Sequence, residues 1–202
     1  MLSIKSVGLS LIVAGVLFSG CIASNSNNIT TNETTGKKFV VDNNLPNWVD
    51  NVQVGIENGV AAVGQTSYSK YGNDVMLPEA MLKAKAELAA TIQEKVYDFQ
   101  RNAAEKANID NIESYGKVFK SASKKIVDGV SLSGASRISR YQSPADGTLY
   151  VRVMISFEKL KKEIKREVKS NADVYKKMAT TQQQANKLVN GVVEESESHW
   201  KN

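Results

Sequence analysis

One apolar stripe constrains the fold of this chain more than any other feature. Apolar side chains recur at steps of three and four residues, which places them on one face of a helix of about seven turns. Asn73 or Asp74 is predicted to cap this helix, and Pro78 and Glu79 suit its first turn. The helix must be buried against another element along the whole stripe. The stripe consists of Leu77, Met81, Ala84, Leu88, Ile92, Val96, Phe99 and Ala103.

A second helix is predicted after a break at residues 108–111, and beyond it the period changes. Its stripe is Ile112, Tyr115, Phe119, Ala122, Ile126 and Val130. From residue 148 to 157 apolar and polar residues then alternate strictly, which is typical of a strand with one buried and one solvated face. Residues 132–141 are also extended in character, and residues 143–147 form a turn, so a β-hairpin is predicted. The buried side of the second strand would be Leu149, Val151, Val153, Ile155 and Phe157.

The remaining elements complete an α+β domain. Residues 60–64 form a short apolar run after the turn dipeptide Asn58-Gly59, which predicts a first strand. A third helical stripe at Leu160, Ile164 and Val168 continues less regularly to about Val193. The predicted order is β-α-α-β-β-α, with helices packed on one face of a small antiparallel sheet of about three strands.

The N-terminus carries a pattern for lipid attachment. Lys5 precedes an apolar run over residues 7–18, which is too short to span a membrane and has the length of a signal-peptide core. The run ends in Leu17-Phe18-Ser19-Gly20-Cys21, which looks like a bacterial lipobox. An uncleaved anchor or a plain signal peptide is the alternative. Because Cys21 is the only cysteine, no intramolecular disulfide is possible, and a covalent lipid on Cys21 is the expected use of the thiol.

Four segments follow from these patterns. Residues 1–20 are the signal peptide, and residues 21–44 are the lipidated cysteine with a flexible tether rich in Asn, Ser and Thr. Residues 45–157 are the α+β domain, and residues 158–202 are a helical extension with a polar tail. Since Ile22 is not the aspartate that retains lipoproteins at the inner membrane, the outer membrane is the expected location, with the domain in the periplasm or at the cell surface.

The composition argues against several functions. The net charge of +5 is mild and forms no basic stripe, so no nucleic-acid partner is predicted. His199, the only histidine, lies in the polar tail, where it is expected to be exposed and not catalytic. No residues have metal-ligand or phosphate-loop spacing. Glu87 and Glu94 share a helix face, but Lys83 is four residues before Glu87, which favours a simple ion pair. The chain is therefore predicted not to be an enzyme, with no cofactor and no small-molecule substrate.

A few residues are candidates for binding a partner. Trp48 is expected either to close the core or to anchor a partner, with the core favoured. Tyr68 and Tyr71 lie in a polar loop that is a natural place for binding. The basic stretch at 159–169 could bind lipid or a partner, but the pairs Glu158–Lys162 and Lys159–Glu163 favour a solvated, salt-bridged surface.

The chain resembles the 20-kDa outer-membrane lipoprotein family of flagellated proteobacteria, over roughly residues 45–157. The resemblance rests on the lipobox, Pro46-Asn47-Trp48-Val49, the small strand ending in Gly64, the Ala-rich helix around residues 80–89, and Tyr150-Val151-Arg152-Val153. It implies a non-enzymatic lipoprotein; one branch of the family builds flagellar basal-disk rings and others are surface antigens.

Two functional hypotheses follow. The first is a structural lipoprotein that associates with itself or with an envelope partner and is linked to flagellar motility. The second is a ligand-binding or adhesive surface lipoprotein that uses the loop at residues 68–73. An enzyme with a glycosidase-like carboxylate pair is a distant third.

Overall fold

A computed structural model describes residues 44–130 and 132–200. Its sheet has the strands β1 (Gly59–Thr66), β2 (Ser136–Gln142) and β3 (Leu149–Ser156). Both neighbouring pairs are antiparallel, and the spatial order is β1-β3-β2, so the hairpin strand β3 lies in the centre. The predicted α+β fold, with a three-stranded antiparallel sheet packed by helices, is confirmed.

The described residues form more helices than the sequence pattern predicts. Before the hairpin come α1 (Asn47–Asp50), α2 (Asn73–Lys106) and α3 (Gly116–Gly129), with 3₁₀ segments η1 (Ile112–Tyr115) and η2 (Leu132–Gly134). The single third helix predicted to run to about Val193 is wrong. The structure has α4 (Phe157–Ser170), α5 (Ala172–Lys176) and α6 (Gln182–His199). Thr181 separates the last two, because its side chain accepts the Gln184 N–H and caps α6.

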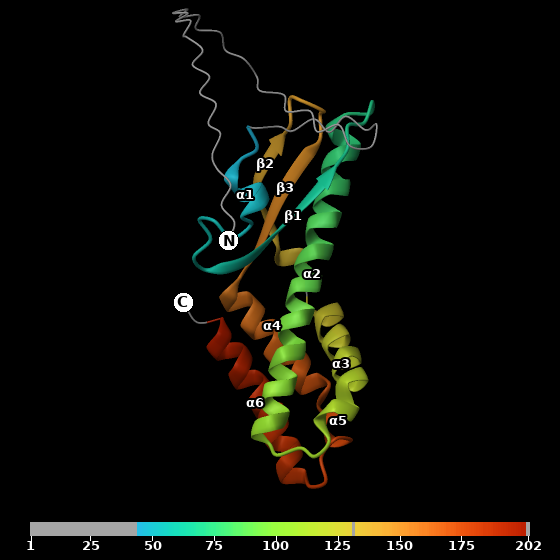
Figure 1. The fold of residues 1–202 in the computed structure, drawn as a ribbon, viewed down its shortest axis with the longest axis vertical. Coiled ribbons are helices and arrows are strands. Elements are labelled where there is room, and N and C mark those ends of the chain that lie inside the picture. The colour runs from blue at the N-terminus through green and yellow to red at the C-terminus, as the bar shows by residue number, and fades with distance from the viewer. Residues whose placement is uncertain (1–43, 131, 201–202) are drawn as a thin grey trace, which may run out of the picture.

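Helix α2 organises the molecule along its full length (Figure 1). Its N-terminal half lies beside the sheet and its C-terminal half lies among α3, α4 and α6. The predicted caps are off by a residue or two, since Gly72, at φ +67°, precedes the helix without a side-chain cap, and Pro78 lies inside the helix rather than in its first turn. A helix-capping glycine at positive φ avoids the steric cost that a side chain would bring.

The buried side of α2 also differs from the predicted stripe at its start. Met76 and Ala80 are fully buried there, whereas Leu77 and Met81 are only partly buried. The reason is the close approach of β1. A Cβ atom on Gly64 would lie 2.9 Å from the Ala84 Cα and closer still to the Ala80 carbonyl oxygen. The strand therefore packs directly on the α2 backbone, over the small residues.

The break between α2 and α3 is confirmed. Asn108 and Asn111 have positive φ values of 52° and 58°, a conformation that asparagine tolerates better than most residues. After this turn α3 runs back along α2 and buries Phe119, Ala122 and Ile126.

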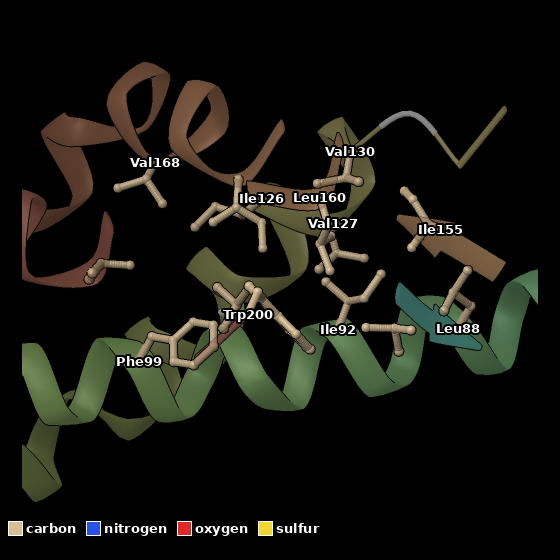
Figure 2. Packing of buried hydrophobic residues seen from close by; sticks show 14 of the residues in the cluster. Leu88, Ile92, Phe99, Ile126, Val127, Val130, Ile155, Leu160, Val168 and Trp200 are labelled. Carbon is tan, nitrogen blue, oxygen red and sulfur yellow. The ribbon is translucent and has the colours of Figure 1, made fainter. Parts of the chain in front are cut away.

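Residues after Phe157 belong to the same hydrophobic core as the sheet. Leu160, Leu188 and Trp200 are members of one cluster with the buried residues of β1, β3 and α2. Figure 2 shows Trp200 beside Phe99 of α2, and the two rings meet edge to face with centroids 6.1 Å apart. The predicted polar tail is wrong, because residues up to His199 continue α6, and Trp200 is only 5% exposed.

One buried polar contact joins α2 to α5. The Gln100 side-chain amide donates a hydrogen bond of 3.1 Å to the Tyr175 hydroxyl. Burial raises the pKa of Tyr175 well above its ordinary value. Because buried polar groups need partners, this pair fixes α5 against the C-terminal part of α2.

Candidate functional site

The predicted lipidation site, Cys21 with the lipobox residues before it, lies outside the described residues, as does most of the predicted tether. Among the helices that the structure describes, none is both long enough and apolar enough to cross a membrane.

Tyr68 and Tyr71 lie together on the surface, in the loop between β1 and α2. They are 66% and 68% exposed. Tyr68 lies against the β2–β3 turn, since a Cβ on Gly147 would be 3.0 Å from its ring. The Lys70 ammonium lies 5.1 Å from the centre of the Tyr71 ring. The two tyrosines thus present aromatic surface at one end of the sheet.

Two further apolar side chains, Val75 and Leu82, are exposed on α2 after this loop and were not predicted as candidates. They are 46% and 70% exposed and lie seven residues apart on α2, hence on one side of the helix. The described residues contain six exposed large hydrophobic side chains, and four of them lie between residues 68 and 82. We group these four, Tyr68, Tyr71, Val75 and Leu82, by their exposure and their closeness in the chain, and call them the α2 apolar surface. The seven-residue spacing of Val75 and Leu82, off the main stripe, is the sequence signal for it.

Charged residues border the α2 apolar surface. The Lys83 ammonium contacts the Glu79 carboxylate at 2.7 Å, and this hydrogen bond lowers the pKa of Glu79. The predicted pair of Lys83 with Glu87 is therefore wrong, since Lys83 turns toward the preceding turn of the helix. A polar border around exposed apolar side chains is the usual arrangement at protein interfaces.

Trp48 lies elsewhere and is not a core residue. It is half-buried, outside the hydrophobic cluster of the described residues, and its ring lies 5.4 Å from the Arg152 guanidinium carbon. Arg152, predicted on the solvated face of its strand, is instead only 9% exposed. Helix α1 and the turn after it cover this face of the sheet, on the side away from α2 (Figure 1).

Arg152 holds the segment after α1 on the sheet. One of its guanidinium nitrogens, Nη1, donates to the carbonyls of Val52 and Val54 at 3.3 and 2.8 Å, and Nη2 donates to the Ser139 hydroxyl at 3.2 Å. Burial lowers the pKa of Arg152. A planar guanidinium can make these contacts simultaneously, whereas an ammonium cannot.

We expect Arg152→Lys to lower the free energy of unfolding by about 1 kcal/mol, because the carbonyls of Val52 and Val54 lose partly buried hydrogen bonds from the guanidinium. Amide exchange of residues 48–54 should rise at the same time. Arg140→Lys, at an exposed position of β2, is the matched control and should change neither quantity. Equal stability of the two variants in urea unfolding would contradict the positioning role of Arg152.

A groove of about 750 Å³ lies between α1, β1 and α2. Leu45 and Val49 line one side, Lys83 and Glu87 line the other, and β1 forms the floor. Tyr68 and Tyr71 are not among its lining residues, so the groove and the α2 apolar surface are separate features.

The catalytic candidates remain apart. His199 is exposed, 5.3 Å from the Phe99 ring centre and 4.6 Å from that of Trp200, and partial burial lowers its pKa. Glu87 and Glu94 are both exposed on α2. Within the described residues no group of three His, Cys, Asp or Glu side chains is placed to hold a metal ion.

The basic stretch is salt-bridged, but through other pairs than those predicted. Arg166 contacts both Glu163 and Glu167 at 2.7 Å. Lys165 reaches Glu197 of α6 at 2.9 Å. The charges of α4 therefore serve contacts within the helix and to α6.

Comparison with protein-family models, curated proteins and solved structures found no match to this chain.

Proposed function

We propose that this protein is a non-enzymatic structural lipoprotein of the bacterial outer membrane. Lipid on Cys21 anchors it, and the α2 apolar surface binds a protein partner, in the first place a second copy of the chain. The proposal is carried by the concentration of exposed apolar side chains in one stretch, since residues 68–82 hold four of the six large ones among the described residues. The lipobox and the resemblance to the 20-kDa outer-membrane lipoproteins support the anchor and the envelope location.

Single exposed apolar residues are normal on a soluble protein, whereas a contiguous set marks an interaction site. Tyrosine is enriched in such sites because its ring gives a large contact area and its hydroxyl stays satisfied in water. Four side chains alone fall short of the roughly 800 Å² per partner of a stable interface. The bordering Glu79–Lys83 pair and the Gly147 turn would supply the remaining contact area.

Anchoring makes a modest interface sufficient. A protein held on a membrane by a multiply acylated cysteine diffuses only along the membrane surface and not into the solution. The contact then forms at a high effective concentration, as in other multivalent systems. A lattice or ring of copies is therefore the expected assembly, and motility is the cellular property to test, given the basal-disk branch of the resembling family.

The experiment is to purify the lipidated protein from its native membrane in mild detergent and measure its mass and assembly state. We expect a lipid adduct on Cys21 and a regular oligomer, and a deletion strain is expected to have reduced motility. The double variant Tyr71→Ala/Leu82→Ser should dissociate the oligomer by at least tenfold in affinity without a change in thermal stability. Val54→Ser/Ile138→Ser removes exposed apolar side chains outside the surface and serves as the matched control.

A monomer carrying the lipid adduct would reject self-association and favour the ligand-binding or adhesive lipoprotein. A chain without the adduct would reject the anchor itself.

A further inference from the structure

The two edges of the sheet differ in their protection against strand pairing. Edge strand β2 carries Arg137 and Arg140 and has a register irregularity between Arg137 and Ser139. Charges and bulges on an edge prevent another strand from adding to it. Edge strand β1, Gly59–Thr66, contains no charged residue and pairs with β3 in unbroken register. The outer edge of β1 therefore has neither the charged residues nor the register irregularity that would prevent another strand from pairing with it.

The outward backbone groups of β1 need hydrogen-bond partners, and at Ala61 a side chain supplies them. The Gln53 side-chain amide donates to the Ala61 carbonyl at 2.9 Å, and the Ala61 N–H donates back to the Gln53 Oε1 at 3.4 Å. This is the double contact that a neighbouring strand would make. Because edge-facing residues alternate along a strand, the backbone groups of Val63 and Gln65 also point outward. Among the described residues no strand pairs with them there.

The groove described above follows this edge and has two unlike walls. Leu45, Val49 and Val52 give the wall on the α1 side its apolar side chains, and Asp50 and Gln53 lie on the same wall. The opposite wall is a polar row on α2, formed by Lys83, Glu87 and Thr91 at steps of four residues. Walls on both sides leave room for one extended segment and exclude the edge of a second whole sheet. An occupant would alternate apolar and polar or charged side chains.

We propose that residues 38–42 of the same chain bind in this groove as a fourth strand beside β1. This segment, Lys38-Phe39-Val40-Val41-Asp42, contains the only run of apolar residues between positions 23 and 44. The described chain enters at Asn44, and Leu45 already lines the groove. Since an extended chain covers about 3.3 Å per residue, the segment reaches the floor of the groove without a long connection.

The side-chain pattern of the segment matches the walls. In a strand, Phe39 and Val41 face one side, toward the apolar side chains of the α1 wall, while Lys38, Val40 and Asp42 face the other. That second side meets Glu87 and Lys83 of α2, so the wall holds an opposite charge for Lys38 and for Asp42, and Lys83 also contacts Glu79. Tethering adds an effective concentration of the order of millimolar.

If residues 38–42 are docked, only residues 22–37 remain as the tether between the lipidated Cys21 and the domain. Docking would also determine at which end of the domain this tether leaves it. The inference does not depend on the proposed self-association, since a monomer can hold its own segment.

Disulfide trapping in the full-length membrane protein tests the proposal. Gln65→Cys is combined in turn with Phe39→Cys, Val40→Cys and Val41→Cys. Because Gly64 faces α2, Gln65 points to the other side of the strand, the side predicted for residues 39 and 41. We expect an intrachain disulfide with position 39 or 41, at least tenfold more than with position 40. Ile138→Cys, on the opposite edge, replaces Gln65→Cys in the matched control and should trap none of them.

Peptide mass analysis locates each disulfide and separates it from any adduct of Cys21. Disulfides between two chains would assign the groove to a second copy and overturn the proposal. The absence of any disulfide, or equal trapping at positions 39, 40 and 41, would overturn it as well.

Amide exchange gives an independent readout without added cysteines. The Val63 and Gln65 amides should be protected in the wild-type protein and exchange at least tenfold faster in Val40→Pro, since proline cannot donate to a strand ladder. Ser26→Pro, outside the segment, is the control and should leave the exchange unchanged. Fast exchange in the wild-type protein would reject a fourth strand of any origin.

Discussion

Gly64→Ala is expected to lower the free energy of unfolding by about 3 kcal/mol. A Cβ at this position would lie 2.9 Å from the Ala84 Cα, and the neighbouring backbone atoms of α2 are closer still. Backbone atoms of a packed helix cannot rotate away as a side chain can, so β1 and α2 must separate. Inserting a methyl group into such a contact costs about 1–3 kcal/mol or more.

For a domain of this size that loss lowers the melting temperature by about 10 °C, measured by circular dichroism. Gly116→Ala is the matched control, because its Cβ would meet only the Tyr97 hydroxyl, at 3.7 Å, at the start of α3. It should be neutral or slightly stabilising. If Gly64→Ala is as stable as Gly116→Ala, the direct packing of β1 on α2 is incorrect.

Trp200→Ala is expected to cost about 3–5 kcal/mol, the usual effect of truncating a buried aromatic side chain. The indole packs against Phe99 of α2, with ring centres 6.1 Å apart, and against Phe157 at the start of α4, at 5.6 Å. Its loss would open a cavity where three helices meet (Figure 2). Chemical denaturation followed by far-ultraviolet circular dichroism measures the change.

The adjacent variant His199→Ala is the control. The His199 ring is exposed but touches the same aromatic rings, so its removal should cost no more than about 1 kcal/mol. A small effect of Trp200→Ala, with unfolding of α6 separate from the rest, would show that the chain after Phe157 is an independent extension and not part of the core.

The sequence patterns that predicted the fold correctly are mostly those that extend over many residues, namely the α2 stripe and the alternation in β3. The asparagines between α2 and α3 are a local signal, and they predicted the break because asparagine tolerates positive φ. For Leu88, Ile92 and Val153 the periodic patterns also gave the buried side correctly, since each is fully buried. The breaks within the C-terminal helices were missed because the stripe there is irregular and Thr181 caps α6 without a strong pattern around it.

The candidate site was only partly predictable. Tyr68 and Tyr71 could be selected because large aromatic residues in a polar loop are exposed whatever the rest of the chain does. The spacing of Val75 and Leu82 places them on one side of α2, but their exposure could not be predicted, since it depends on where the sheet and the other helices cover α2. The position of Trp48 beside Arg152 likewise needs residues about 100 positions apart to meet.

By itself the sequence determined the order and type of the elements from β1 to β3 and the buried face of most of them, because backbone periodicity sets the direction in which each side chain points. Only the tertiary structure decided that β1 packs on the α2 backbone at Gly64, that Arg152 is buried, and that Trp200 closes the core. Those outcomes depend on which distant segments remove a side chain from water, and local spacing carries no information about its distant neighbours.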